Sequence, residues 1–132
     1  MTQVDFTSLI KDFNASIFWQ FLGIEISEVT EGYAETKYQV KQEHLNINGT
    51  LHGGIYTSLL DSTMGLASRT IGLAKSVTLQ LNTQFLGAVT HGELLTKAKI
   101  IHRSRSTALI EGKLFAEDGT LLAFATATFR MG

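Results

Sequence analysis

The feature that most constrains the fold is a helical pattern, residues 53–71, that is apolar on nearly every side. At about 100° per residue, the apolar side chains cover most of the circumference and leave one narrow stripe of small and polar residues. A helix that is apolar all round is normally buried, so we expect the rest of the chain to wrap around it. The apolar positions are Ile55, Tyr56, Leu59, Leu60, Met64, Leu66, Ala67 and Ile71. The stripe consists of Gly54, Ser58, Asp61, Gly65 and Ser68.

Alternation with a period of two on both sides of this helix predicts β-strands. The runs before the helix are residues 24–29 and 33–40, about a turn at Glu31-Gly32. The runs after it are residues 76–85, 94–103, 107–116 and 120–129, the last two joined by the hairpin signal Asp118-Gly119. This order indicates the α+β class, with an antiparallel sheet wrapped around the helix. We expect the sheet face that packs on the helix to include Leu79, Leu81, Ile100, Leu109 and Phe124.

The N-terminal region has its own helical pattern. Between Phe6 and Phe21 apolar residues recur at steps of three and four, with Asp5 or Thr7 available as a cap. We expect one short amphipathic helix that covers an edge of the sheet. Its aromatic residues could line a ligand pocket, although such stripes are more often plain core.

Length and composition bound the possibilities further. The chain has 132 residues, of which 44% are hydrophobic and 17% charged, so we expect a single domain over residues 1–132. A net charge of -1 without a basic stripe gives no reason to expect a nucleic-acid partner. No segment has the pattern of a signal peptide or of a membrane span, which favours a cytoplasmic protein without a membrane partner.

Several kinds of site are excluded or disfavoured by residue type. The absence of cysteine excludes a disulfide, a thiolate nucleophile and a cysteine metal site. His44, His91 and His102 lack the mutual spacing of a metal site. We therefore expect these histidines on the surface or in loops and no metal.

Asp61 is the one carboxylate on the helix, and two readings of it are open. It could cap or pair with a neighbouring polar group, which is the commoner case for an isolated helical aspartate. The alternative comes from the helix start, His52-Gly53-Gly54, where backbone N–H groups lack intrahelical partners and lie at the positive end of the helix dipole. Such an end suits an anion or the oxyanion of acyl transfer.

The spacing between the two features predicts how they could act together. Gly54 and Asp61 are seven residues apart, so about 10 Å separates them along one helix axis. One carbonyl would not reach both. Two helices that run antiparallel across a two-fold axis would bring Gly54 of one chain to Asp61 of the other, giving two equivalent sites per dimer.

These residues also resemble a known family. Asn46, residues 49–54 (GTLHGG) and Asp61, nine residues after His52, are similar to the hotdog-fold thioesterases, most of all to the PaaI-like group named for phenylacetic acid degradation. The resemblance implies the hotdog fold and hydrolysis of an aromatic or fatty acyl-CoA thioester. It also implies a homo-oligomer, a dimer or a dimer of dimers, and no cofactor besides the coenzyme A of the substrate. Aspartate instead of glutamate favours the PaaI-like group over the group that includes bacterial naphthoyl-CoA thioesterases.

The resemblance assigns roles residue by residue. Asp61 would be the nucleophile or the general base that activates water, and the Gly54 N–H would polarise the thioester carbonyl. His52 and Asn46 would shape the loop and orient water or the thioester. Thr78 would contribute a hydroxyl from a strand. The sequence does not choose between the two routes open to Asp61.

Other residues are candidates for binding the substrate. Gly53, Ser58, Tyr56 and Phe85 are candidates for contacts to the acyl-thioester part. The turn Arg103-Ser104-Arg105 could hold the phosphates of coenzyme A, and it could equally be a solvated turn.

Two other functions stay open at this stage. The same fold serves as a non-catalytic acyl-CoA or acyl-carrier-protein binding module, against which the retention of Asp61 argues. A hotdog dehydratase or hydratase needs a histidine and a carboxylate acting together. It is disfavoured because the one histidine near this site belongs to the glycine loop.

Overall fold

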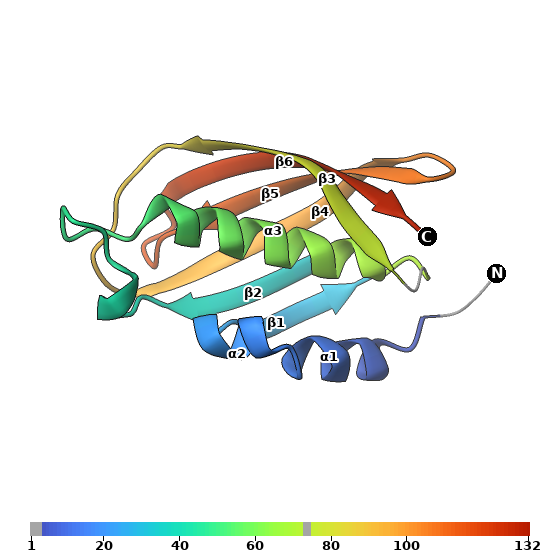
Figure 1. Cartoon of the computed structure of the whole chain (residues 1–132), viewed down its shortest axis with the longest axis horizontal. Coiled ribbons are helices and arrows are strands. Elements are labelled where there is room, and N and C mark those ends of the chain that lie inside the picture. Colours follow the sequence, from blue (N-terminus) through green and yellow to red (C-terminus); the bar gives the residue numbers. More distant parts are fainter. Residues whose placement is uncertain (1–3, 73–74) are drawn as a thin grey trace.

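The computed structural model describes residues 4–72 and 75–132. One long helix lies across the face of an antiparallel sheet, with two short helices beside it (Figure 1). The helices are α1 (Phe6–Asn14), α2 (Ile17–Leu22), the short 3₁₀ helix η1 (Gln42–His44) and α3 (Gly53–Arg69). The strands are β1 (Glu25–Thr30), β2 (Tyr33–Gln39), β3 (Ser76–Phe85), β4 (Glu93–Arg103), β5 (Thr107–Phe115) and β6 (Leu121–Met131).

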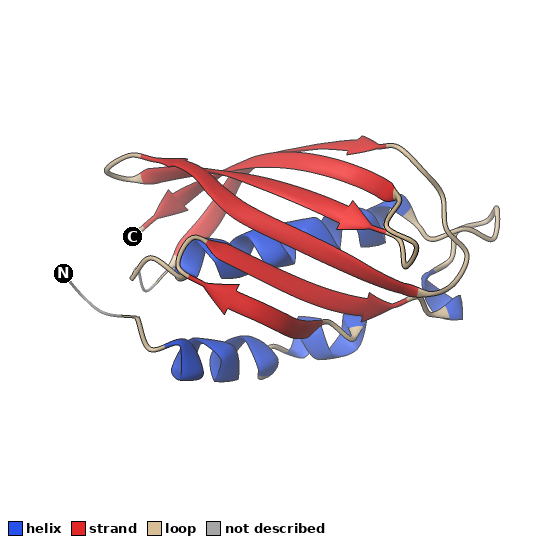
Figure 2. Ribbon diagram, turned by 180° about the vertical axis from the view of Figure 1, so that it is seen from behind, coloured by secondary structure: helices blue, strands red, loops and turns tan. Residues whose placement is uncertain are grey.

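The sheet has six strands in the order β1-β2-β4-β5-β6-β3, and each neighbouring pair is antiparallel. Seen from behind, it curves around α3, which is visible beyond the strands (Figure 2). Residues of α3 contact β2, β3, β4, β5 and β6. The predicted α+β class, with an antiparallel sheet wrapped around one long helix, is therefore confirmed.

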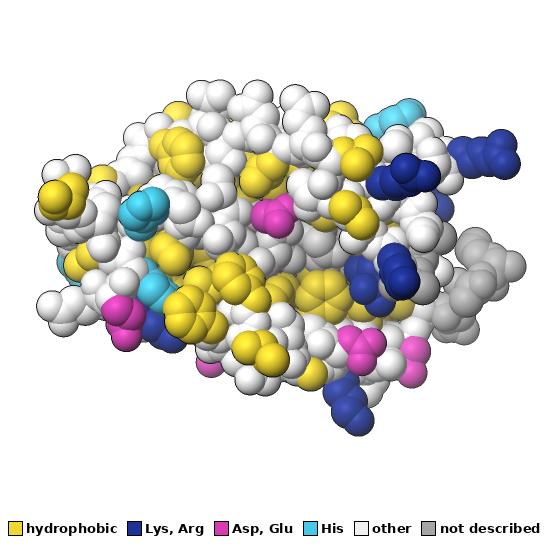
Figure 3. Space-filling model, in the orientation of Figure 1, with side chains coloured by type: hydrophobic (Ala, Val, Ile, Leu, Met, Phe, Trp, Pro, Cys, Tyr) yellow, Lys and Arg dark blue, Asp and Glu magenta, His cyan; other side chains and the backbone are white. Residues whose placement is uncertain are grey.

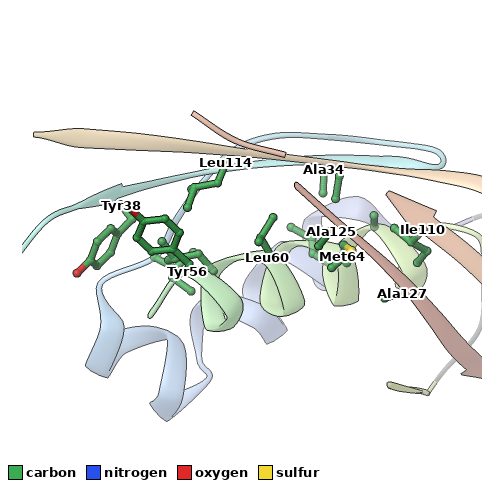
Figure 4. Close-up of a cluster of buried hydrophobic side chains, with 14 of the residues drawn as sticks. Ala34, Tyr38, Tyr56, Leu60, Met64, Ile110, Leu114, Ala125 and Ala127 are labelled. Atoms are coloured by element: carbon green, nitrogen blue, oxygen red, sulfur yellow. The ribbon is translucent and has the colours of Figure 1, made fainter. Parts of the chain in front are cut away.

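Small residues on the sheet let α3 approach closely. A Cβ atom added at Gly112 would lie 3.1 Å from Leu60 Cδ2 and 3.2 Å from Met64 Sδ, and both of these helix side chains are fully buried. Alanines face the helix from neighbouring strands, and Figure 4 shows several of them opposite Leu60 and Met64. They are Ala34, Ala98, Ala108, Ala123, Ala125 and Ala127. The sequence therefore places bulk on the helix and leaves space for it on the sheet.

Truncation of this core should cost much of the stability. We expect Leu60→Ala to lower the free energy of unfolding by about 3 kcal/mol, because the closely packed neighbours cannot close the cavity. The matched control is Ile47→Ala, since Ile47 is 100% exposed, and its effect should stay within about 0.5 kcal/mol. Urea unfolding measures both. Equal losses would contradict the packing described here.

The predicted inner face of the sheet is right at two positions. Leu81 and Ile100 pack against the buried core as expected. The prediction for Leu79 is wrong, because this side chain is 57% exposed. A register shift between Thr78 and Gln80 breaks the alternation of β3 at this point, so a strict period of two misplaces Leu79.

The predictions that Leu109 and Phe124 face the helix are also wrong. Leu109 is 39% exposed, while Ile110 beside it is fully buried against the helix. Phe124 is half-buried between the fully buried Ala123 and Ala125, so it points to the opposite face of β6. In β6 the close approach of α3 leaves room for alanine but not for phenylalanine on the inner face. In β5 the inner face runs through Ala108, Ile110 and Leu114, so the predicted phase of this strand is off by one residue.

The N-terminal region forms two helices instead of the single one expected. The chain extends at Ser16, whose side chain caps α2 by accepting a hydrogen bond from the Trp19 N–H at 3.3 Å. Asp5 caps α1 in the same way, through the Ser8 N–H. Phe13 and Trp19 pack edge to face across the break, with ring centroids 5.2 Å apart. Both helices run beside β1, and α1 contacts this edge strand, as expected (Figure 1).

Candidate active site

The loop before α3 is closed at its base by backbone contacts. Leu45 and Leu51 form an isolated antiparallel bridge, and the His52 N–H donates to the His44 carbonyl at 3.0 Å. The Leu51 N–H donates to the carbonyl of Val89 at 2.8 Å. The loop therefore enters α3 from a fixed position.

Asn46 organises the inside of this loop. Its side-chain oxygen accepts from the N–H groups of Asn48 at 2.8 Å and Thr50 at 3.2 Å, and its amide nitrogen donates to Thr50 Oγ1 at 3.0 Å. Its backbone N–H donates to the Thr50 carbonyl at 2.7 Å. These contacts lie within the loop, so they account for its shape without a substrate.

His52 occupies the N-cap position of α3, and this changes the expectation for Gly54. The Gly54 N–H donates to His52 Nδ1 at 2.7 Å, so it is not the free donor that the helix start suggested. Gly53 differs: among residues 4–72 and 75–132 no hydrogen bond is donated by its N–H. The unengaged amide at the start of the helix therefore belongs to Gly53.

Two aromatic side chains lie beside this amide. A Cβ added at Gly53 would be 3.3 Å from Phe85 Cε1, and the rings of Phe85 and Tyr56 are 5.8 Å apart between centroids. Phe85 is 55% exposed, whereas Tyr56 is buried and donates its hydroxyl proton to the Gly87 carbonyl at 2.7 Å. The structure thus brings Gly53, Tyr56 and Phe85 together in an apolar wall next to a free N–H.

Asp61 lies in the middle of α3 and is half-buried. Its Oδ1 accepts from Thr78 Oγ1 at 2.7 Å, the one hydrogen bond to this carboxylate among the described residues. In a single chain the sheet covers the opposite side of α3, so the side that carries Asp61 is left uncovered. Gly54 is exposed, and Ser58 and Gly65 are half-buried, along the same uncovered stripe. The Ser58 hydroxyl donates back to the Gly54 carbonyl at 2.8 Å.

Comparison with known proteins supplies the family. The model of the Thioesterase superfamily matches residues 48–123, which include the glycine loop, α3, the strands β3, β4 and β5, and the start of β6. The chain belongs to the thioesterase superfamily. One relative in it, the 1,4-dihydroxy-2-naphthoyl-CoA hydrolase of Listeria monocytogenes, is 30% identical over 114 residues, which are 81% of this chain and 89% of that protein.

Solved structures share the fold of this chain. A hypothetical thioesterase from Streptococcus pneumoniae, determined with coenzyme A, is 28% identical and superposes with a TM-score of 0.85 over 93% of this chain and 96% of that one. The Escherichia coli PaaI protein from the phenylacetic acid degradation operon is 23% identical, with a TM-score of 0.91 over 96% of this chain and 92% of that one. The hotdog fold expected from the sequence is therefore confirmed.

In this thioesterase-superfamily chain the Arg103-Ser104-Arg105 turn lies away from the glycine loop. Arg103 lines a surface pocket with Gly32 and Ile71, just beyond the C-terminal end of α3. Dark-blue basic side chains gather at the end of the molecule where α3 finishes (Figures 1 and 3). Within one chain the structure does not bring this turn and Gly53 together.

The described residues lack two features: a cluster of metal-ligating side chains and a helix that could span a membrane. Residues 4–72 and 75–132 contain no group of three or more His, Asp or Glu side chains placed to hold a metal ion. None of the helices in that part of the chain is long and apolar enough to cross a bilayer.

His44 was expected on the surface or in a loop. It instead ends the short helix η1 and is only 7% exposed. Its Nδ1 is hydrogen-bonded to the hydroxyl of Tyr38, which is 2% exposed. Burial, with a smaller effect from Lys41, lowers the pKa of His44, and Glu43 opposes the shift. Burial likewise raises the pKa of Tyr38. At neutral pH the contact therefore joins a neutral imidazole to a protonated phenol.

The lowered pKa of His44 predicts that acid destabilises the protein. Below the ordinary value of 6.5, the unfolded chain takes up a proton at His44 before the folded chain does. The free energy of unfolding should therefore fall as the pH drops from 6.5 toward the pKa of the folded state. Urea unfolding between about pH 7.5 and about pH 5 measures this slope. His44→Asn should flatten it, and an unchanged slope in that variant would assign the acid sensitivity to other groups.

Proposed function

We propose that this protein is an acyl-CoA thioesterase that hydrolyses an aromatic or fatty acyl-CoA to the free acid and coenzyme A. The observation that carries the proposal is the Asp61 carboxylate, fixed by Thr78 on the same uncovered stripe of α3 that begins at the glycine amides. Membership of the thioesterase superfamily supports it. So do the naphthoyl-CoA hydrolase relative and the similar protein determined with coenzyme A.

The chemistry of the site follows from its two ends. Because Thr78 occupies Oδ1, the second oxygen of Asp61 is available to take a proton from water as that water attacks the carbonyl carbon. Direct attack by the carboxylate, followed by hydrolysis of the anhydride, is the alternative. In both routes the carbon–sulfur bond breaks and the thiolate of coenzyme A leaves and is protonated. No cofactor beyond the substrate's own coenzyme A is needed.

The carbonyl oxygen would accept a hydrogen bond at the start of α3. Gly53 offers its N–H directly, whereas the Gly54 N–H must first leave His52 Nδ1. Donors fixed before the reaction are effective because they need no reorganisation as charge develops. The apolar wall of Tyr56 and Phe85 would exclude water from one side of the thioester.

The distance along α3 supports a site shared between two chains. Gly53 and Asp61 are eight residues apart, or about 12 Å along the axis. In a two-fold dimer with antiparallel α3 helices, the Gly53 amide of one chain would face Asp61 of the other. The 103–105 turn of the second chain would then lie beyond the same glycine loop, where its arginines could bind the phosphates of coenzyme A. The proposed assembly is such a dimer or a dimer of dimers.

Thiol release from a panel of acyl-CoA esters tests the proposed activity. The panel holds phenylacetyl-CoA, hydroxylated benzoyl-CoA and straight acyl chains of graded length. The wild-type protein should release thiol from at least one ester and rank the acyl groups. If the protein binds several esters and releases thiol from none of them, the proposed thioesterase function is wrong. The protein is then a non-catalytic acyl-CoA binding module.

A further inference from the structure

A buried polar contact lies behind the glycine loop and takes no part in the chemistry described above. The hydroxyl of Tyr38, on β2, meets Nδ1 of His44, at the end of η1, and their rings are nearly parallel, at 17° with centroids 5.7 Å apart. Figure 4 shows the Tyr38 ring at the margin of the apolar cluster, with its hydroxyl directed away from the other labelled side chains. The contact therefore joins the core of the sheet to the segment that precedes the loop.

From His44 the connection to the site is short. The His44 carbonyl accepts from the His52 N–H at 3.0 Å, and His52 Nδ1 accepts from the Gly54 N–H at 2.7 Å. The position of the His44 backbone thus fixes the His52 backbone. The ring of His52 in turn orients the first amides of α3.

The surroundings of His44 leave Tyr38 as its one side-chain hydrogen-bond partner among the described residues. On the α2 side it is covered by the ring of Phe21, whose centroid is 6.2 Å away, and the α2 sequence IFWQFL contains no titratable group. The charged groups near it, Lys41 and Glu43, belong to its own segment. A buried imidazole nitrogen without a hydrogen-bond partner costs free energy. The Tyr38 hydroxyl supplies that partner and so fixes the orientation of the ring.

We propose that Tyr38 and His44 are positioning residues for the start of α3: through the His52 N–H they set the direction of the Gly53 and Gly54 amides. This role rests on the proposed thioesterase function, in which one of these amides receives the carbonyl oxygen. Neither residue touches the substrate. Their contact is directional, so it fixes the loop in a way that apolar packing alone does not.

The test compares Tyr38→Phe with a matched control in the same strand. Thr36→Val also removes one buried hydroxyl from β2, that of a residue 1% exposed whose Oγ1 lies 2.7 Å from Thr63 Oγ1, but this contact leads to the middle of α3 and not to the loop. Nitrogen-edited NMR spectra report the Gly54 amide directly, without any activity. Tyr38→Phe should move that signal upfield and speed its hydrogen exchange by about tenfold, as the bond to His52 loosens. Thr36→Val should leave both unchanged.

Kinetics on the best ester of the panel give a second readout. Tyr38→Phe should lower kcat by about tenfold with KM nearly unchanged, because a small misplacement of a donor acts on the transition state. Thr36→Val should change neither constant. A Gly54 amide that is the same in Tyr38→Phe as in the wild type would overturn the positioning role. A wild-type protein that hydrolyses no ester would overturn the proposed function, while the NMR comparison would still decide the role of the pair.

Replacement of His44 covers the case in which Tyr38→Phe does not fold. The side-chain amide of His44→Asn can keep a partner for the Tyr38 hydroxyl, whereas His44→Leu cannot. We expect the Gly54 signal of His44→Asn to stay near that of the wild type and that of His44→Leu to move. Equal Gly54 signals in the two variants would again overturn the proposal.

Discussion

Replacing Asp61 with asparagine is expected to lower kcat for thioester hydrolysis by about 10³-fold. The amide keeps the size of the side chain, and its oxygen can still accept from Thr78 Oγ1, which lies 2.7 Å from Asp61 Oδ1 in the wild type. What it loses is the ability to take a proton from water or to attack the carbonyl. Thiol release, followed with a thiol-reactive dye, measures the effect.

Thr78→Val separates the effect of the Asp61 charge from the effect of its orientation. It removes the hydroxyl that orients Asp61 and leaves the carboxylate, so kcat should fall by about tenfold only. Calorimetric titration with coenzyme A checks that both variants still bind the leaving group. If Asp61→Asn hydrolyses the ester as fast as the wild type, Asp61 is a structural residue and the proposed chemistry is wrong.

Gly53→Pro is expected to lower kcat by about 10²-fold, because it removes the amide proton of the free donor at the start of α3. Proline is well tolerated at the first position of a helix, where the N–H has no intrahelical partner. His52, the preceding residue, has φ -63° and ψ 136°, which suits a residue before proline. The helix should therefore survive, and circular dichroism checks that it does.

Gly53→Ala is the matched control for this substitution. It adds a Cβ in the same place, 3.3 Å from the Phe85 ring, and keeps the N–H. Phe85 is 55% exposed and can give way in both variants, so the alanine variant should hold most of the activity. Equal kcat values for the proline and alanine variants would exclude the Gly53 N–H as the donor and favour the Gly54 N–H.

Most of the architecture could be predicted because the period of the apolar residues changes clearly along the chain. The strand at residues 76–85 was predicted with the bounds of β3 as observed. Which residues of each strand face inward was harder to predict. The register shift between Thr78 and Gln80 depends on pairing with β6 and is not visible in the apolar pattern. The break at Ser16 was missed because the apolar spacing continues across it, although serine is itself a strong cap residue.

The candidate site shows the same division. The glycines and Asp61 became candidates through residue type and spacing. The contact of Asp61 with Thr78 joins two residues to which the resemblance had given separate roles. The capping of Gly54 by His52 was not foreseen, because histidine is not among the usual N-cap residues. The burial of His44 depends on η1 folding back against Tyr38, a tertiary contact that no periodicity encodes.

The central claim is that the carboxylate and the amide acting on one carbonyl come from two chains, and mixing two inactive variants tests it most directly. Asp61→Asn and Gly53→Pro chains are combined, allowed to exchange subunits and assayed, with mass spectrometry to confirm mixed dimers. Random exchange makes half of the dimers mixed, each with one intact site, so about a quarter of the wild-type activity should return. Activity that stays at the level of the two parents despite subunit exchange would contradict the shared site.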